Sequence, residues 1–132
     1  DFSAGTAVTP ANPANSTGWD IAFNHYDLSQ NSGPNGIGDC AAFYAWGELT
    51  DPTDIAAFTE QPAGAPLFPD IPSSCMTDWY NYNGMTHQLT SKSNVYLLKT
   101  GDKVYKLRIE GYYKNVGGVP TSGHYSFIWK EL

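Results

Sequence analysis

The chain has 132 residues, with 7 Lys and Arg against 13 Asp and Glu, and it carries a formal net charge of −6 at pH 7. Charged residues make up 15% of the chain and aromatic residues 14%, alongside 13 glycines and 9 prolines. This balance excludes a basic nucleic-acid-binding surface and a long helical or coiled-coil protein. The aromatic content argues against disorder, and no apolar run approaches the roughly 20 residues of a membrane span. We therefore expect one compact, acidic domain over residues 1–132.

The first half of the chain reads as loops around one clear strand pattern. Residues 1–18 are rich in small and turn-forming residues and predict an exposed N-terminal segment. Apolar residues at alternate positions predict a strand within 19–28, with a change of phase near Tyr26. Residues 31–39, with the sequence NSGPNGIGD, form a turn-rich stretch. Between 41 and 74 a short apolar run, either a strand or one helical turn, is followed by proline-rich sequence that predicts long loops.

Regular strands are clearest in the C-terminal half. Three runs of β-branched and aromatic residues favour strands, at 94–100, 103–110 and 124–131. Gly101 lies in a tight connection between the first two, and Gly117 begins the turn region before the third. Strands joined in series in this way form an antiparallel meander. The predicted fold class is all-β: a mainly antiparallel single-domain β fold with long loops and a C-terminal three-strand meander.

The two cysteines, Cys40 and Cys75, are too far apart in sequence for a CxxC redox or zinc motif. A disulfide between them would close a long loop and contribute roughly 3–4 kcal/mol of stability. Two buried thiols are the alternative. A disulfide implies an oxidising compartment, either the periplasm, the cell surface or the extracellular space. The first residues, Asp1-Phe2-Ser3, lack the features of a signal peptide, so we expect a mature or trimmed chain.

Motifs for catalysis are absent from the sequence. His25, His87 and His124 do not form an HxH, HxxxH or HExxH pattern, and His25 and His124 are expected to be packed or surface side chains. No GxSxG nucleophile motif occurs, and no glycine-rich phosphate loop with its lysine. Aspartates in loops could supply the two carboxylates of a paired-carboxylate hydrolase, but loop acids commonly serve solubility: Asp51, Asp54, Asp70 and Asp78. We expect a protein that is not an enzyme.

Candidate ligand-binding side chains gather in residues 75–89, with the sequence CMTDWYNYNGMTHQL. Met76, Met85 and His87 lie among aromatic residues that include Tyr82. Thioether and imidazole groups are axial ligands of haem iron, and aromatic rings can cover a porphyrin face. Alternatively, the methionines fill gaps in the core and the aromatic residues anchor a long connection.

Several stretches, in order, resemble the HmuY-type haem-binding lipoproteins. Residues 19–27 (WDIAFNHYD) resemble the family's first strand motif, and residues 31–42 (NSGPNGIGDCAA) resemble the glycine-rich turn after it. Residues 79–82 (WYNY) resemble the aromatic strand that leads to the pocket loop. Residues 95–113 (VYLLKTGDKVYKLRIEGYY) are similar to the family's hairpin, and residues 124–132 (HYSFIWKEL) to its closing strand.

The resemblance implies an all-β haemophore-like protein of the outer-membrane surface, the extracellular space or the periplasm. Such a protein captures haem or porphyrin and delivers it to a TonB-dependent outer-membrane receptor. The family's paired histidine ligands are not reproduced here: the position nearest to one of them is Gly84 or Met85, with His87 slightly downstream. Because some branches of the family use methionine ligands, the resemblance implies Met85 with His87 or Met76 as candidate iron ligands, and Tyr82 as a further haem contact. The other ligand loop falls in the unmatched residues 43–74. The comparison also leads us to expect that one N-terminal strand is missing from this chain.

Two other functions compete with haem capture. The same scaffold without its ligand could serve as a non-catalytic accessory or structural subunit of an outer-membrane or surface assembly, since a sheet that lacks an edge strand can accept one from a partner. A secreted hydrolase is third, with no motif in its favour. The absorption spectrum of protein purified with haem available distinguishes the first function from the others.

Overall fold

The structure is a computed structural model that describes residues 1–44, 56, 68–69 and 76–132. Within these ranges the regular elements are strands and two short 3-10 helices, η1 (Pro13–Asn15) and η2 (Gly33–Asn35). The strands are β1 (Ile21–Asn24), β2 (Asp27–Gln30), β3 (Ala41–Tyr44), β4 (Phe68–Pro69), β5 (Tyr80–Asn83), β6 (Gln88–Ser91), β7 (Val95–Thr100), β8 (Lys103–Val116) and β9 (Val119–Glu131). The predicted all-β fold class is confirmed.

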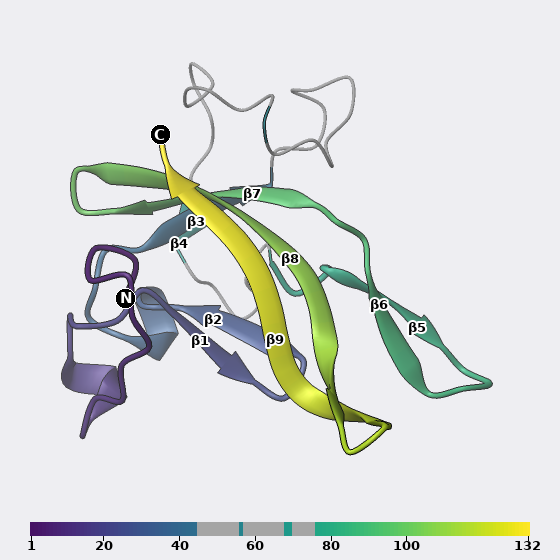
Figure 1. The fold of residues 1–132 in the computed structure, drawn as a ribbon. Coiled ribbons are helices and arrows are strands. Elements are labelled where there is room, and N and C mark those ends of the chain that lie inside the picture. The colour runs from purple at the N-terminus through teal and green to yellow at the C-terminus, as the bar shows by residue number, and fades with distance from the viewer. Residues whose placement is uncertain (45–55, 57–67, 70–75) are drawn as a thin grey trace.

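One antiparallel sheet of five strands, in the order β4-β3-β7-β8-β9, forms the body of the molecule. The long strands β8 and β9 curve together down the molecule, while the β1–β2 hairpin lies on one side of them and the β5–β6 hairpin on the other (Figure 1). None of the helices in the described ranges is long and apolar enough to cross a membrane.

The C-terminal meander has the predicted order, β7-β8-β9, but longer strands than the sequence indicated. Thr100 pairs with Lys103 and Val116 pairs with Val119, so each turn has only two residues. Glycines with positive φ begin both turns, as two-residue hairpins require. Strand β8 continues past the predicted end at residue 110 because Gly111 lies where the register with β9 shifts, at a bulge that bends the pair without ending it.

The segment predicted as one strand over residues 19–28 is a hairpin. Asn24 pairs with Asp27, and the two residues between them make the turn. His25 adopts a φ of 53°, in the left-handed region that histidine enters more readily than most residues. The change of phase expected near Tyr26 is therefore the reversal of the chain.

The core lies on one face of the sheet. Tyr105, Leu107 and Ile109 alternate along β8 and are each no more than 1% exposed. They belong to one cluster with residues from the strands and from the segments before β1 and β5, among them Phe2, Leu28, Met76, Trp79 and Tyr112. Burial of this aromatic and aliphatic surface is the main favourable contribution to folding.

The N-terminal segment is mostly exposed, as expected, but Phe2 is an exception at 6% exposed. Its backbone N–H donates to Oδ2 of the buried Asp20 at 2.6 Å, and Thr100 Oγ1 donates to the other carboxylate oxygen at 2.7 Å. Asp20 thus joins the N-terminal segment to β7. A buried carboxylate is tolerated where hydrogen bonds replace its water.

The glycine-rich turn of residues 31–39 is organised around a buried asparagine. Asn31 Nδ2 donates to the carbonyl oxygens of Ser16 and Trp19 at 2.9 and 2.7 Å, and Gly38 N–H donates to Asn31 Oδ1 at 3.1 Å. A Cβ atom at Gly36 would lie 2.0 Å from Asn31 Oδ1. Glycine is needed at positions 36 and 38 because the backbone there lies too close to Asn31 to leave room for a Cβ atom.

Cys40, the residue just before β3, is buried at 1% exposed. Cys75 lies outside the described residues, so the Cys40–Cys75 disulfide stays a prediction. Most of the predicted loop region between 45 and 75 also lies outside the described part of the chain. Residues 41–44 form a strand, which decides between the two alternatives for the start of that region.

Candidate functional site

The β5–β6 hairpin brings three of the predicted site residues together: Tyr82, Met85 and His87. Asn83 shapes the turn, since its Oδ1 accepts the N–H groups of Met85 and Thr86 at 2.9 and 3.2 Å and its carbonyl oxygen accepts the His87 N–H at 2.8 Å. An asparagine side chain that bonds to the backbone two residues ahead is a common way to build a turn. The hairpin therefore holds these side chains in one place.

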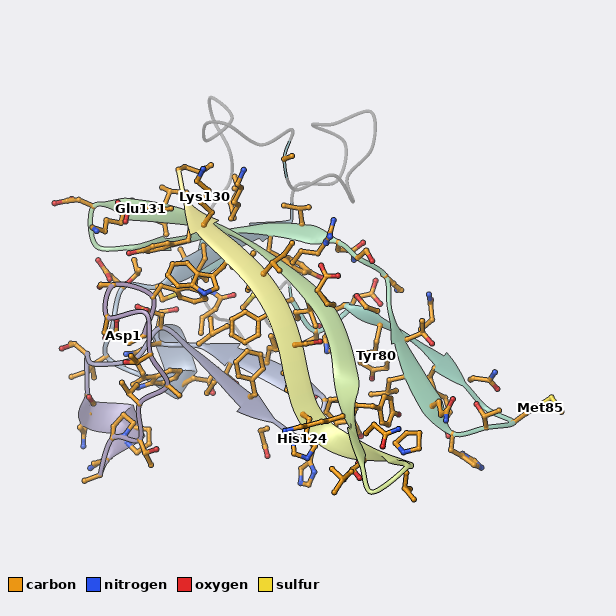
Figure 2. The ribbon with its side chains drawn as sticks, viewed as in Figure 1. Asp1, Tyr80, Met85, His124, Lys130 and Glu131 are labelled. Atoms are coloured by element: carbon orange, nitrogen blue, oxygen red, sulfur yellow. The ribbon has the colours of Figure 1, made fainter. Side chains whose placement is uncertain are left out.

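Met85 lies at the tip of the hairpin and points away from the rest of the molecule (Figure 2). Its side chain is 94% exposed, and Tyr82 on the adjoining strand is 58% exposed. Methionine is among the residues most often buried in folded proteins. A fully exposed thioether at a hairpin tip is thus a feature that packing within the described residues does not explain, and it is available to a ligand.

Tyr82 Oη contacts the Nδ1 atom of His87, and the centroids of the two rings are 6.0 Å apart. The proton between them can belong to either group. When Nδ1 carries it and donates to Tyr82, the lone pair of Nε2 is available to a metal. Metal-binding histidines usually donate their other ring N–H to such a partner. His87 also has a φ of 55°, so the turn holds it in a conformation that most side chains avoid.

Met76 lies apart from these residues. It is 0% exposed and belongs to the core cluster, together with Trp79. A thioether with no exposed surface cannot reach an iron outside the core without leaving the core. The structure thus places Met76 in the core, where it fills space between aromatic rings, and its role toward haem stays a prediction.

The base of the hairpin is fixed to the sheet. Leu89 N–H donates to Tyr113 Oη at 2.9 Å, and Ser91 Oγ donates to the carbonyl oxygen of Ile109 at 2.5 Å, both on β8. Trp79 Nε1, just before β5, donates to the carbonyl oxygen of Tyr26 at 2.9 Å. These bonds join the base of the hairpin to β8 and to the β1–β2 turn, while its tip projects away from the molecule (Figure 2).

An aromatic cluster beside this base was not predicted as a unit. Tyr26 and Tyr80 have ring centroids 5.8 Å apart, Trp79 and Tyr125 5.4 Å, and Tyr112 and Tyr125 5.2 Å. Burial raises the pKa of Tyr125, whose hydroxyl donates to the His25 carbonyl oxygen at 2.8 Å, and burial also raises the pKa of Tyr80. The sequence marked each aromatic residue but not their convergence, because they come from β1–β2, β5, β8 and β9.

Other polar chemistry is sparse in the described ranges. They contain no group of three or more His, Cys, Asp or Glu side chains that could hold a metal ion. His25 and His124 are exposed side chains, as expected, although His25 lies in a turn and not in a strand. The hairpin thus presents one thioether and one imidazole, which suits a metal that already has most of its ligands.

Comparisons with known proteins identify one family. A family model described as HmuY protein matches residues 1–87, which include every strand through β5 and the turn with Met85 and His87. No curated protein matches the chain.

Among solved structures, the chain is similar to the apo HmuY analog from Tannerella forsythia, with 14% identity and a TM-score of 0.66 over 96% of this chain and 72% of that one. It is also similar to a Bacteroides vulgatus protein described as HmuY-like and heme-binding, with 18% identity and a TM-score of 0.57 over 92% and 71% of the two chains. A third, described as a lipoprotein from Bacteroides fragilis, has 17% identity and a TM-score of 0.53 over the same shares. At such identities the likeness concerns the fold.

Proposed function

Because the chain belongs to the HmuY family, we propose that it binds haem or a related porphyrin through the β5–β6 hairpin. The observation that carries this proposal is the 94% exposed thioether of Met85, placed two residues from the His87 imidazole at the hairpin tip. Both groups are axial ligands of haem iron. The description of the Bacteroides vulgatus structure as heme-binding supports the ligand class.

The geometry limits how the two side chains can act. Met85 and His87 lie on the same turn, so they approach a porphyrin from one side. We infer that they are alternatives for one axial position, or a ligand and its neighbour, and that a second axial ligand comes from elsewhere in the chain. Tyr82 would lie against the porphyrin edge or face and would hold the His87 ring.

A binding protein of this kind needs no catalysis. Affinity would come from buried porphyrin surface and from the iron–ligand bond, both of which a protruding hairpin can supply when it closes against a second surface. The proposed role is therefore that of a carrier and not of an enzyme.

We further propose a location on the outer-membrane surface, outside the cell or in the periplasm, with delivery of the ligand to a TonB-dependent outer-membrane receptor. The HmuY family and the Bacteroides fragilis neighbour described as a lipoprotein support an envelope protein. The competing role is an accessory subunit of a surface assembly that has lost haem binding. Ligand binding separates the two roles directly.

The experiment is a titration with haem, followed by the Soret absorption band under oxidising and then reducing conditions. Saturable binding with a shifted Soret band is expected in at least one of the two states. Thioether ligands favour reduced iron, so we expect the reduced state to show the clearer signal from Met85. Absence of any saturable change in both states would refute haem binding and would favour the accessory role.

A further inference from the structure

One cavity in the described residues lies away from the hairpin. It has a volume of about 620 Å³ and opens between the N-terminal segment, β1 and the core-facing side of β9. Asp1, at its edge, and Met85 lie on opposite sides of β9 (Figure 2). Six aromatic rings line this groove: Phe2, Trp19, Phe23, Tyr125, Phe127 and Trp129. Its volume is within the range of about 300–1,000 Å³ that small-molecule sites occupy.

Its walls are held by contacts that do not depend on a ligand. Phe2 packs edge-on against Trp129 with ring centroids 5.1 Å apart, and Phe23 contacts both Tyr125 and Phe127 at 4.4 and 5.5 Å. The backbone bond from Phe2 to Asp20 fixes the N-terminal wall. Trp129 nevertheless remains 38% exposed, so the described residues leave part of the side chain uncovered. The groove is thus preformed and open.

The charged side chains near the groove indicate which class of ligand it can bind. All seven Lys and Arg residues of the chain occur from Lys92 onward, and none of them lines the groove. Asp1 carries the one acidic side chain in the lining. A carboxylate or sulfonate would lose its water there with no Lys or Arg side chain to pair with it, which is costly. A neutral apolar molecule pays no such penalty and gains contact with the aromatic rings.

We propose that this groove is a second binding site, which takes a neutral, apolar small molecule of aromatic or aliphatic character. It is separate from the proposed haem site in both position and chemistry, since haem carries two propionates and iron, and no Lys, Arg, His or Met side chain lines the groove. Binding at one site is expected to leave the other unchanged.

The test uses two fluorescent probes of similar shape and different charge. N-phenyl-1-naphthylamine is neutral, and 8-anilinonaphthalene-1-sulfonate adds a sulfonate to the same ring system. We expect saturable binding of the neutral probe to the whole chain, at least about tenfold tighter than binding of the anionic one. A reversed preference, or no saturable binding of the neutral probe, would overturn the proposal.

Two variants locate the probe. Trp129→Ala removes one wall, and Ala7→Trp fills the groove from an exposed position of the N-terminal segment, where loss of folding is not expected. Both substitutions should lower the affinity for the neutral probe by roughly tenfold or more. The control Val116→Ser changes a 51% exposed apolar residue at the β8–β9 turn and should have no effect.

Two further outcomes bear on the site. Binding of the neutral probe that is unchanged in Met85→Ala and in the presence of haem would support a separate site. Displacement of the probe by haem would overturn the proposal. Light scattering with the titration tests for a second copy as the occupant. A dimer that forms as probe binding disappears would show that another chain fills the groove and would also overturn the proposal.

Discussion

The hydroxyl of Tyr82 contacts Nδ1 of His87 across the β5–β6 hairpin, and this contact directs the other ring nitrogen of His87 away from the tyrosine. An imidazole held in this way loses less freedom when it binds a metal. The two side chains therefore act as a pair in the proposed site.

Substitution of Tyr82 by Phe removes that contact and keeps the ring. We expect the affinity for haem to fall by about tenfold where His87 contributes to binding, because outer partners of metal-bound histidines commonly matter by that factor or more. The stability of the fold should change by no more than about 0.5 kcal/mol, since Tyr82 is 58% exposed.

A double-mutant cycle with His87→Ala provides the control for this prediction. In the His87→Ala background the effect of Tyr82→Phe on haem affinity should disappear. An equal effect in both backgrounds would mean that Tyr82 contacts the porphyrin independently of His87.

The two methionines form a matched pair for a test of stability. Met76→Ala removes a fully buried side chain and should lower the free energy of unfolding by about 2–5 kcal/mol, as measured by urea denaturation. Met85→Ala alters a residue that is 94% exposed and should change the free energy of unfolding by no more than about 0.5 kcal/mol. Similar costs for both substitutions would contradict the placement of Met76 in the core and Met85 in solvent.

Alkaline pH should destabilise the fold through Tyr125. Burial raises the pKa of its phenol above the value of about 10 in an unfolded chain, so the folded state favours the protonated form. The resulting stability is fully present below pH 10 and is lost as the pH rises further, because the unfolded chain then releases the proton first. Thermal unfolding of wild type and Tyr125→Phe between pH 8 and about 11 measures this.

In Tyr125→Phe the decline above pH 10 should be shallower than in the wild type. The variant also loses the bond to the His25 carbonyl oxygen, which should cost about 0.5–1.5 kcal/mol at neutral pH. Parallel pH curves for the two proteins would show that other groups cause the decline.

Substitution of Gly36 tests the packing of the glycine-rich turn, with Gly84 in the β5–β6 turn as its control. A methyl group at Gly36 would lie 2.0 Å from Asn31 Oδ1, so Gly36→Ala should destabilise the fold by ~2 kcal/mol or more. At Gly84 no atom lies within 4 Å of the added carbon, so Gly84→Ala should be neutral or slightly stabilising. Urea denaturation compares them, and a tolerated Gly36→Ala would contradict the close approach of this backbone to Asn31.

The sequence predicted the meander well because its signals are local. Strand patterns and glycines at two-residue turns, such as Gly101 and Gly117, lie within a few residues of one another. The β1–β2 turn was missed because its left-handed residue is His25, without the glycine or asparagine that usually marks such a turn. Strand β8 ran further than predicted because Gly111 serves a bulge and does not end the strand.

The grouping of the candidate site residues was predictable in part for the same reason. Tyr82, Met85 and His87 lie within six residues of sequence, and one hairpin keeps them together. Met76 is only a few residues away in sequence, yet it faces the core, and its burial depends on contacts with distant strands. The groove was not predicted because Phe2 and Trp129, which meet in it, lie at opposite ends of the chain.

In the proposed function the hairpin tip supplies an iron ligand, and a haem titration of the double variant Met85→Ala/His87→Ala removes both candidate ligands at once. The matched control is Val116→Ala, at an exposed apolar position of the β8–β9 turn. We predict that the wild type and the control show a saturable Soret shift in the same redox state, and that the double variant, while still folded, loses at least about tenfold in affinity and shows an altered spectrum. A double variant with wild-type affinity and spectrum would contradict the account.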